Sequence, residues 1–123
     1  MNRKLYHLQT KDYYSLLNFH KILLEAKFHP KPENESISGS PYIAELCQEA
    51  ASLLLQSEKA SDWEDWLQLK NRADYRQRAI LQMKQCRQWQ NALPETKKKL
   101  AENYLAPFLY TETELEEVIN EVD

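Results

Sequence analysis

Apolar residues recur every three or four positions along most of the chain, which is the period of an amphipathic helix and not of a strand. The pattern is cleanest in residues 41–56. There, one face carries Ile43, Leu46, Cys47, Ala50, Leu53 and Leu54, and the opposite face is polar. Ser40 and Pro41 stand at its start, a capping serine followed by a proline suited to the first helical position. The sequence therefore predicts a helix that begins at Pro41.

Similar patterns and start signals divide most of the remaining chain into helices. Ser61 with Glu64, and Thr111 with Glu114, have the form of a capping box, and Pro94 is placed to open another helix. We predict an all-α protein, a compact bundle of five to six helices with no significant sheet. The helices are expected at about residues 11–28, 41–56, 62–70, 74–92, 94–105 and 112–121.

The apolar stripe changes direction near residue 70. Trp63 and Trp66 lie on one stripe, whereas a second stripe runs from Tyr75 to Leu93 on another line. A straight helix would direct these two stripes to different sides. We therefore predict a break within residues 70–74, and a single helix over residues 62–92 is the alternative.

Glycine is almost absent, since Gly39 is the only one in the chain. Tight hairpins and phosphate-binding loops use several glycines, so the composition favours helices joined by polar loops. Residues 29–40 contain this glycine and two of the five prolines, and we predict a mobile loop there. The length of 123 residues suits a single helical domain over residues 1–123.

The cysteines and the lengths of the apolar runs indicate in which cellular compartment the protein is expected. The first ten residues contain no apolar run typical of a signal peptide. No stretch approaches the roughly 20 apolar residues of a membrane span. We therefore expect a cytoplasmic protein without membrane association. Thiols stay reduced in that compartment, so Cys47 and Cys86 are expected to be free and buried on apolar helical faces.

Charge is unevenly distributed, although the net charge is only −3. Residues 76–100 carry seven basic residues and one acidic residue, and residues 101–123 carry seven acidic and no basic residues. We define the basic sector as Arg72, Arg76, Lys84, Arg87, Lys97, Lys98 and Lys99. Such a surface can follow phosphate groups. The simpler interpretation is a solvated face that pairs with the acidic C-terminal helix over residues 111–123, in the same chain or in a neighbour.

His20 is the one histidine placed in the middle of an apolar face. A core histidine with satisfied hydrogen bonds is the simpler interpretation, and a metal ligand or general base is the alternative. No H-E-x-x-H, paired-cysteine or nucleophile motif accompanies it. The sequence therefore predicts no catalytic residue, no metal site and no cofactor, and a protein that is not an enzyme.

Trp63 and Trp66 form a second candidate surface, because they are three residues apart among acidic residues. They suit either a protein-binding hot spot or the core. The favoured function is protein–protein interaction, as an adaptor, an inhibitor or immunity-type protein, or an accessory protein, with a partner or with a second copy. The alternatives are a nucleic-acid-associated regulator that uses Arg78 and the basic sector within residues 72–99, and a helical metal protein or enzyme centred on His20.

Overall fold

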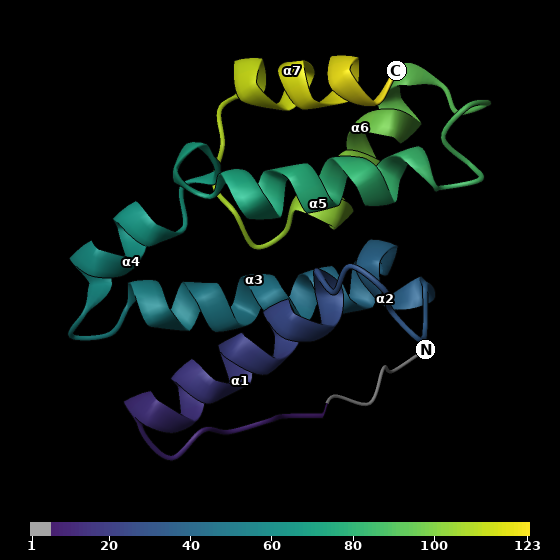
Figure 1. The fold of residues 1–123 in the computed structure, drawn as a ribbon. Coiled ribbons are helices and arrows are strands. Elements are labelled where there is room, and N and C mark those ends of the chain that lie inside the picture. The colour runs from purple at the N-terminus through teal and green to yellow at the C-terminus, as the bar shows by residue number, and fades with distance from the viewer. Residues whose placement is uncertain (1–5) are drawn as a thin grey trace, which may run out of the picture.

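The computed structural model describes residues 6–123, and within this range the chain forms seven α-helices and no sheet, which confirms the predicted all-α class. The helices are α1 Tyr13–Lys27, α2 Ser36–Gly39, α3 Pro41–Leu55, α4 Ala60–Trp66, α5 Ala73–Lys84, α6 Pro94–Leu105 and α7 Glu112–Val122. One 3-10 turn, η1 Leu69–Asn71, separates α4 from α5 and confirms the predicted break. In Figure 1, α7, α5 and α3 lie one below another, and α1 packs against α3.

Three helices begin where the local sequence predicts. The Ser40 side chain accepts a hydrogen bond from the Ile43 N–H, and Pro41 occupies the first position of α3. Thr111 and Glu114 form a capping box at α7, in which each side chain accepts a backbone N–H at 3.1 Å. Pro94 opens α6, which has the predicted bounds. These starts depend on contacts within a single helical turn.

The predicted helix over residues 62–70 is wrong at both ends, and the Ser61 capping box does not form. The turn before α4 gives the reason. The Ser57 hydroxyl donates to the Leu54 carbonyl and accepts from the Lys59 N–H, so the chain becomes helical at Ala60. Ser61 therefore lies inside the first turn. At α1 the N-cap is Asp12, which accepts from the Ser15 N–H, so this helix begins slightly later than residue 11.

The predicted helix over residues 74–92 is also too long, because α5 ends at Lys84. The following N–H groups of Gln85, Cys86, Trp89 and Ala92 each bond to the carbonyl three residues earlier. These turns direct Trp89 into the core and leave Leu93 exposed, whereas a continuous helix would place both on one face. Cys86 is consequently half-buried beyond the end of α5 and is not on a helical face.

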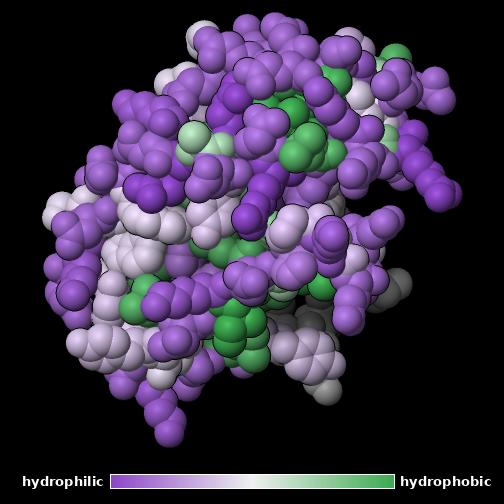
Figure 2. All heavy atoms as spheres, viewed as in Figure 1, coloured by the Kyte–Doolittle hydropathy of each residue, from purple (hydrophilic) through white to green (hydrophobic). Residues whose placement is uncertain are grey.

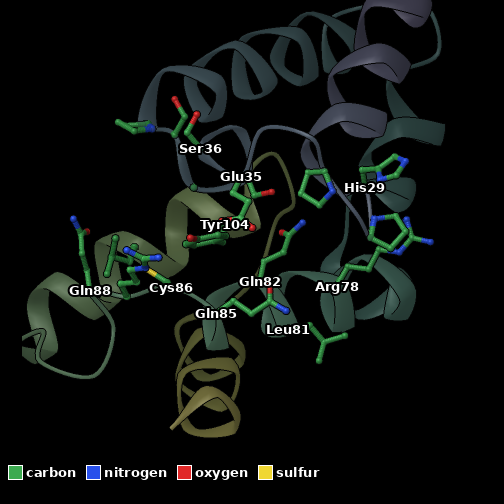
Figure 3. A pocket seen from close by; sticks show the side chains of 18 of the residues that line it. His29, Glu35, Ser36, Arg78, Leu81, Gln82, Gln85, Cys86, Gln88 and Tyr104 are labelled. Atoms are coloured by element: carbon green, nitrogen blue, oxygen red, sulfur yellow. The ribbon is translucent and has the colours of Figure 1, made fainter.

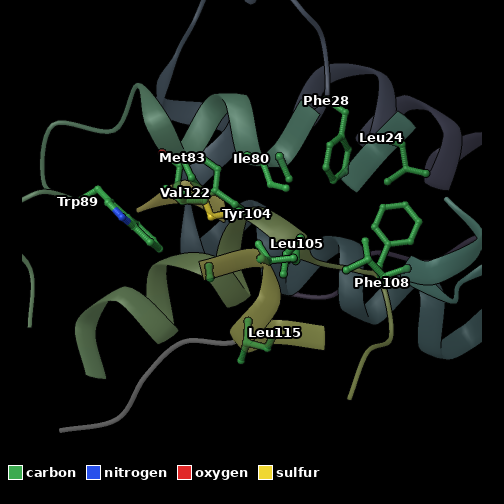
Figure 4. Close-up of a cluster of buried hydrophobic side chains, with 14 residues drawn as sticks. Leu24, Phe28, Ile80, Met83, Trp89, Tyr104, Leu105, Phe108, Leu115 and Val122 are labelled. Atoms are coloured by element: carbon green, nitrogen blue, oxygen red, sulfur yellow. The ribbon is translucent and has the colours of Figure 1, made fainter. Parts of the chain in front are cut away.

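The buried side chains gather in two clusters. The larger cluster joins α5, α6 and α7 to the end of α1, and Figure 4 shows part of it around Ile80, Met83 and Leu105. The smaller cluster lies between α1 and α3 and includes Leu16 and Cys47. Because α1 contributes to both clusters, it connects the two halves of the fold.

The predicted mobile loop over residues 29–40 ends in a packed helical turn. α2 contacts α1, α3, α5 and α6. Ser38 is buried and donates to the Lys27 carbonyl at 2.9 Å. A Cβ atom on Gly39 would lie 2.7 Å from Cζ of Tyr104. The φ angle of Gly39 is not positive, so its role is to allow this close approach of α2 to α6 rather than to form a turn.

Figure 2 shows a largely hydrophilic surface on which apolar side chains form small separate patches. The large apolar side chains that remain exposed include Ile22, Tyr42, Leu81 and Leu93. Within residues 6–123 no helix has the length and apolarity needed to cross a bilayer.

Candidate functional site

An open cleft, here called the α2–α5 cleft, lies between residues 29–42 and the helices α5 and α6. Its volume is about 710 Å³. Figure 3 shows Arg78, Leu81 and Gln82 on α5, with Glu35 and Ser36 across from them. Leu81 is 49% exposed at this cleft and Tyr42 is 77% exposed. The cleft therefore combines accessible apolar side chains with polar groups from two opposing walls.

Hydrogen bonds to the end of α1 fix the walls of the cleft. Arg78 Nη1 donates to the Phe28 carbonyl at 3.0 Å, and Gln82 Nε2 donates to the Lys27 carbonyl at 3.0 Å. The same Lys27 carbonyl accepts the Ser38 hydroxyl. Carbonyls at the end of a helix have no partner within that helix. Here they tie α1, α2 and α5 to one another.

The side chain of Lys27 lies beneath this junction and is fully buried, with 0% exposure. Its Nζ donates to the Tyr104 carbonyl at 2.6 Å, in the last turn of α6, and lies 4.5 Å from the centroid of the Phe28 ring. A cation is favoured at the carboxyl end of a helix. Burial nevertheless lowers the pKa of Lys27 from 10.5 to about 7, with Cys47 opposing this change. Burial also raises the pKa of the Cys47 thiol from 9.0 to about 11.

Lys27 is not among the residues predicted from the sequence, although the pattern of α1 contains a signal for it. Lys27 follows Leu24 by three residues and Leu23 by four, so it continues the apolar stripe of α1. A lone lysine at such a position either extends to solvent or is buried with a partner. The distant Tyr104 carbonyl decides in favour of burial.

The other titratable groups of the cleft include Tyr104 and His29. Burial and a hydrogen bond with Cys86 raise the pKa of Tyr104, so its hydroxyl stays protonated at neutral pH. His29 Nδ1 accepts the Lys31 N–H. Among the described lining residues, no nucleophile is hydrogen-bonded to a histidine or a carboxylate.

The structure divides the predicted basic sector, and part of it pairs with α7 of the same chain. The three ion pairs are Arg76–Glu121 at 2.7 Å, Lys97–Asp123 at 2.9 Å and Lys98–Glu112 at 3.1 Å. The first is bidentate, and its hydrogen bonds raise the pKa of Arg76 and lower that of Glu121. Asp123 also accepts from Trp89 Nε1 at 2.7 Å. Pairing with the acidic helix is thus the correct interpretation for these three basic residues.

The remaining members of the basic sector are dispersed. The Arg72 guanidinium lies 4.9 Å from the centroid of the Trp66 ring. Arg87 lines the α2–α5 cleft and is the only member of the sector to do so. Lys84 and Lys99 are exposed and form no ion pair with residues 6–123. The sector is therefore not one continuous surface.

Trp63 and Trp66 are half-buried, and they enclose His20. The His20 ring is 2% exposed and meets the two tryptophan rings edge-on, with centroid distances of 5.1 and 5.5 Å. Trp63 Nε1 donates to the Tyr13 hydroxyl at 3.0 Å. The tryptophans thus contribute mainly to internal packing.

The interpretation of His20 as a core residue is correct, but the expectation that its hydrogen bonds are satisfied is wrong. Within residues 6–123 neither ring nitrogen has a hydrogen-bond partner, and the two tryptophan rings pack edge-on against the imidazole. Burial lowers the pKa of His20 from 6.5 to about 4, so the ring is neutral at neutral pH. Within residues 6–123 no three histidine, cysteine or carboxylate side chains are grouped to hold a metal ion.

The α2–α5 cleft is therefore the place where accessible apolar side chains, arginines and a fixed backbone come together. Arg78 and Arg87 line it together with Leu81 and Tyr42. Its chemistry offers apolar contact and charged hydrogen bonds. Comparison of the chain with known protein families, characterised proteins and solved structures finds no match, so the assignment of this site rests on its geometry.

Proposed function

We propose that the protein acts by protein–protein interaction, and that the α2–α5 cleft receives a segment of the partner. The observation that carries this proposal is the exposure of Leu81 and Tyr42 at a concave site of about 710 Å³. Burial of such side chains drives association. A hollow of this size accommodates several side chains of a bound segment. We further propose that the protein is cytoplasmic, uses no cofactor and catalyses no reaction.

The fixed walls of the cleft support this function. The Lys27 carbonyl holds both Ser38 and Gln82, and the contact of Gly39 with Tyr104 sets the spacing between α2 and α6. A site that is formed before binding loses less conformational entropy when the partner arrives.

Nucleic-acid binding is less favoured because carboxylates of α7 already form ion pairs with part of the basic sector. Three of its seven residues already pair with carboxylates of α7, and a phosphate backbone would have to displace them. The remaining basic residues lie on separate parts of the molecule, so they do not provide a continuous phosphate track.

The test is selection of short random peptides, displayed on phage, against the immobilised protein. Selected peptides are then measured on Leu81→Glu and on the matched control Leu53→Glu, which changes a similarly exposed leucine outside the cleft. We expect binding to Leu81→Glu to be weaker by about tenfold, because burial of the exposed half of the leucine contributes about 1 kcal/mol and desolvation of a carboxylate in its place adds a further cost. Peptides that bind both variants as well as the wild type would refute the proposal. Molecular mass in solution, measured for the wild type and Leu81→Glu, tests whether a second copy occupies the cleft.

A further inference from the structure

We propose that the segment received by the α2–α5 cleft is acidic, with carboxylate side chains on both sides of an apolar anchor. This inference rests on the proposed function and adds the chemical class of the partner. It follows from the way in which the fold separates the charged residues of α5 and of the turn after it.

α5 presents basic residues on two different sides. Arg76 turns towards α7 and is neutralised by Glu121. Arg78 lies two residues further along α5 and lines the cleft, as does Arg87 beyond the end of the helix. The acidic helix thus covers one side of α5 and leaves two arginines at the cleft.

The arginines at the cleft keep donors for a ligand. Arg78 is exposed, and within residues 6–123 only its Nη1 forms a hydrogen bond, to the Phe28 carbonyl, which holds the guanidinium in place. Arg87 is exposed and forms no ion pair with residues 6–123. Glu35, on the wall across from Arg78, is the only carboxylate among the described lining residues. The planar guanidinium group suits a carboxylate, which it can bind through two parallel hydrogen bonds.

The order of residues along this wall suggests the pattern of the ligand. Leu81 lies three residues after Arg78, so the two side chains are neighbours on the helix surface. Figure 3 places Arg78 towards one end of the cleft and Cys86 and Gln88, the sequence neighbours of Arg87, towards the other, with Leu81 between them. A segment whose apolar side chain contacts Leu81 would therefore have an arginine on each side. An acidic residue before and after the apolar anchor matches this arrangement.

The closing experiment compares two charge reversals in the full-length protein. Peptides selected from the random library are measured on Arg87→Glu and on Lys99→Glu, an exposed lysine outside the cleft that also lacks an ion pair with residues 6–123. We expect the selected peptides to be rich in Asp and Glu. Their affinity should fall by about five- to tenfold on Arg87→Glu and remain unchanged on Lys99→Glu. The difference should shrink as salt is added, because exposed charges are screened.

The outcomes distinguish this inference from the proposed function. Neutral or basic peptides that lose affinity on Leu81→Glu, and not on Arg87→Glu, would overturn the acidic partner and leave the proposed function intact. Peptides that are indifferent to Leu81→Glu would overturn both. A random oligonucleotide is added as a competitor, and we expect it to displace the peptides poorly. Displacement as effective as that by unlabelled peptide would assign the cleft to polyanions in general and refute a peptide-specific site.

Discussion

Replacing Lys27 with methionine is expected to remove most of the pH dependence of stability near neutrality. The amine is fully buried, and its pKa in the folded protein is about 7 rather than 10.5. At pH values between about 7 and 10.5 the unfolded chain binds more protons than the folded one, so the free energy of unfolding rises with pH. Over the whole window the rise amounts to about 5 kcal/mol.

Cys47 limits the part of this rise that can be observed. Its thiol pKa is raised from 9.0 to about 11 by burial, so above pH 9 the unfolded chain loses the thiol proton first and stability falls. His20 adds a further rise below about pH 7, so the effect of Lys27 is seen alone between about pH 7 and pH 9, where it amounts to about 2 kcal/mol. Methionine leaves the Tyr104 carbonyl without its donor, at a cost of about 1–2 kcal/mol that does not vary with pH.

Urea denaturation followed by tryptophan fluorescence, between about pH 7 and pH 9, measures these quantities. Wild type should gain about 2 kcal/mol across this range and Lys27→Met should stay nearly flat. The control is Lys21→Met, which changes an exposed lysine of the same helix and should retain the wild-type slope. If Lys27→Met kept that slope, the buried amine would not be its source.

Three further changes test other parts of the structure. Gly39→Ala should destabilise the protein by about 1–3 kcal/mol, because its Cβ would meet the buried Tyr104 ring. Urea denaturation should show a smaller loss in a Tyr104→Leu background, and an equal loss in both backgrounds would exclude this clash as the cause. The folded-state pKa of His20 lies below its unfolded value, so wild-type stability should decline as pH falls from 6.5 to about 4. His20→Phe should remove that decline. Between pH 7 and pH 5 its free energy of unfolding should therefore rise by about 2 kcal/mol relative to that of wild type. If urea denaturation showed the same decline at acid pH in both proteins, a buried neutral imidazole would not be its cause. Deletion of residues 111–123 should abolish the cooperative thermal transition seen by circular dichroism, because α7 supplies three buried residues to the larger cluster. The control Glu121→Gln only breaks an exposed ion pair and should lower the free energy of unfolding by less than about 1 kcal/mol. If the deletion protein still folded cooperatively, α7 would not have the role assigned to it.

The sequence by itself was sufficient for the all-α class and for the beginnings of α3, α6 and α7. Ser40 with Pro41, Pro94, and Thr111 with Glu114 act on backbone groups within one helical turn, so neighbouring residues determine the outcome. The opposite charges of residues 76–100 and residues 101–123 also indicated ion pairs between the basic sector and the acidic helix. They did not indicate which residues pair.

Only the tertiary structure decided where α5 ends and where the candidate site lies. The helical period continues through Trp89, but the chain turns after Lys84 so that this side chain reaches the core beside α7. Of the basic sector and the two tryptophans, Arg87 alone lines the α2–α5 cleft, because the cleft forms between segments far apart in sequence.

Lys27 shows why some features could be predicted from the sequence and others depend on the tertiary structure. Its position on an apolar stripe is visible in the sequence, but its partner is a carbonyl 77 residues away. A cap is determined by the nearest few residues, whereas the environment of a buried charge depends on which distant backbone groups the packed helices bring within hydrogen-bond distance. Helix starts could therefore be predicted from the sequence, and the buried lysine with the cleft above it could not.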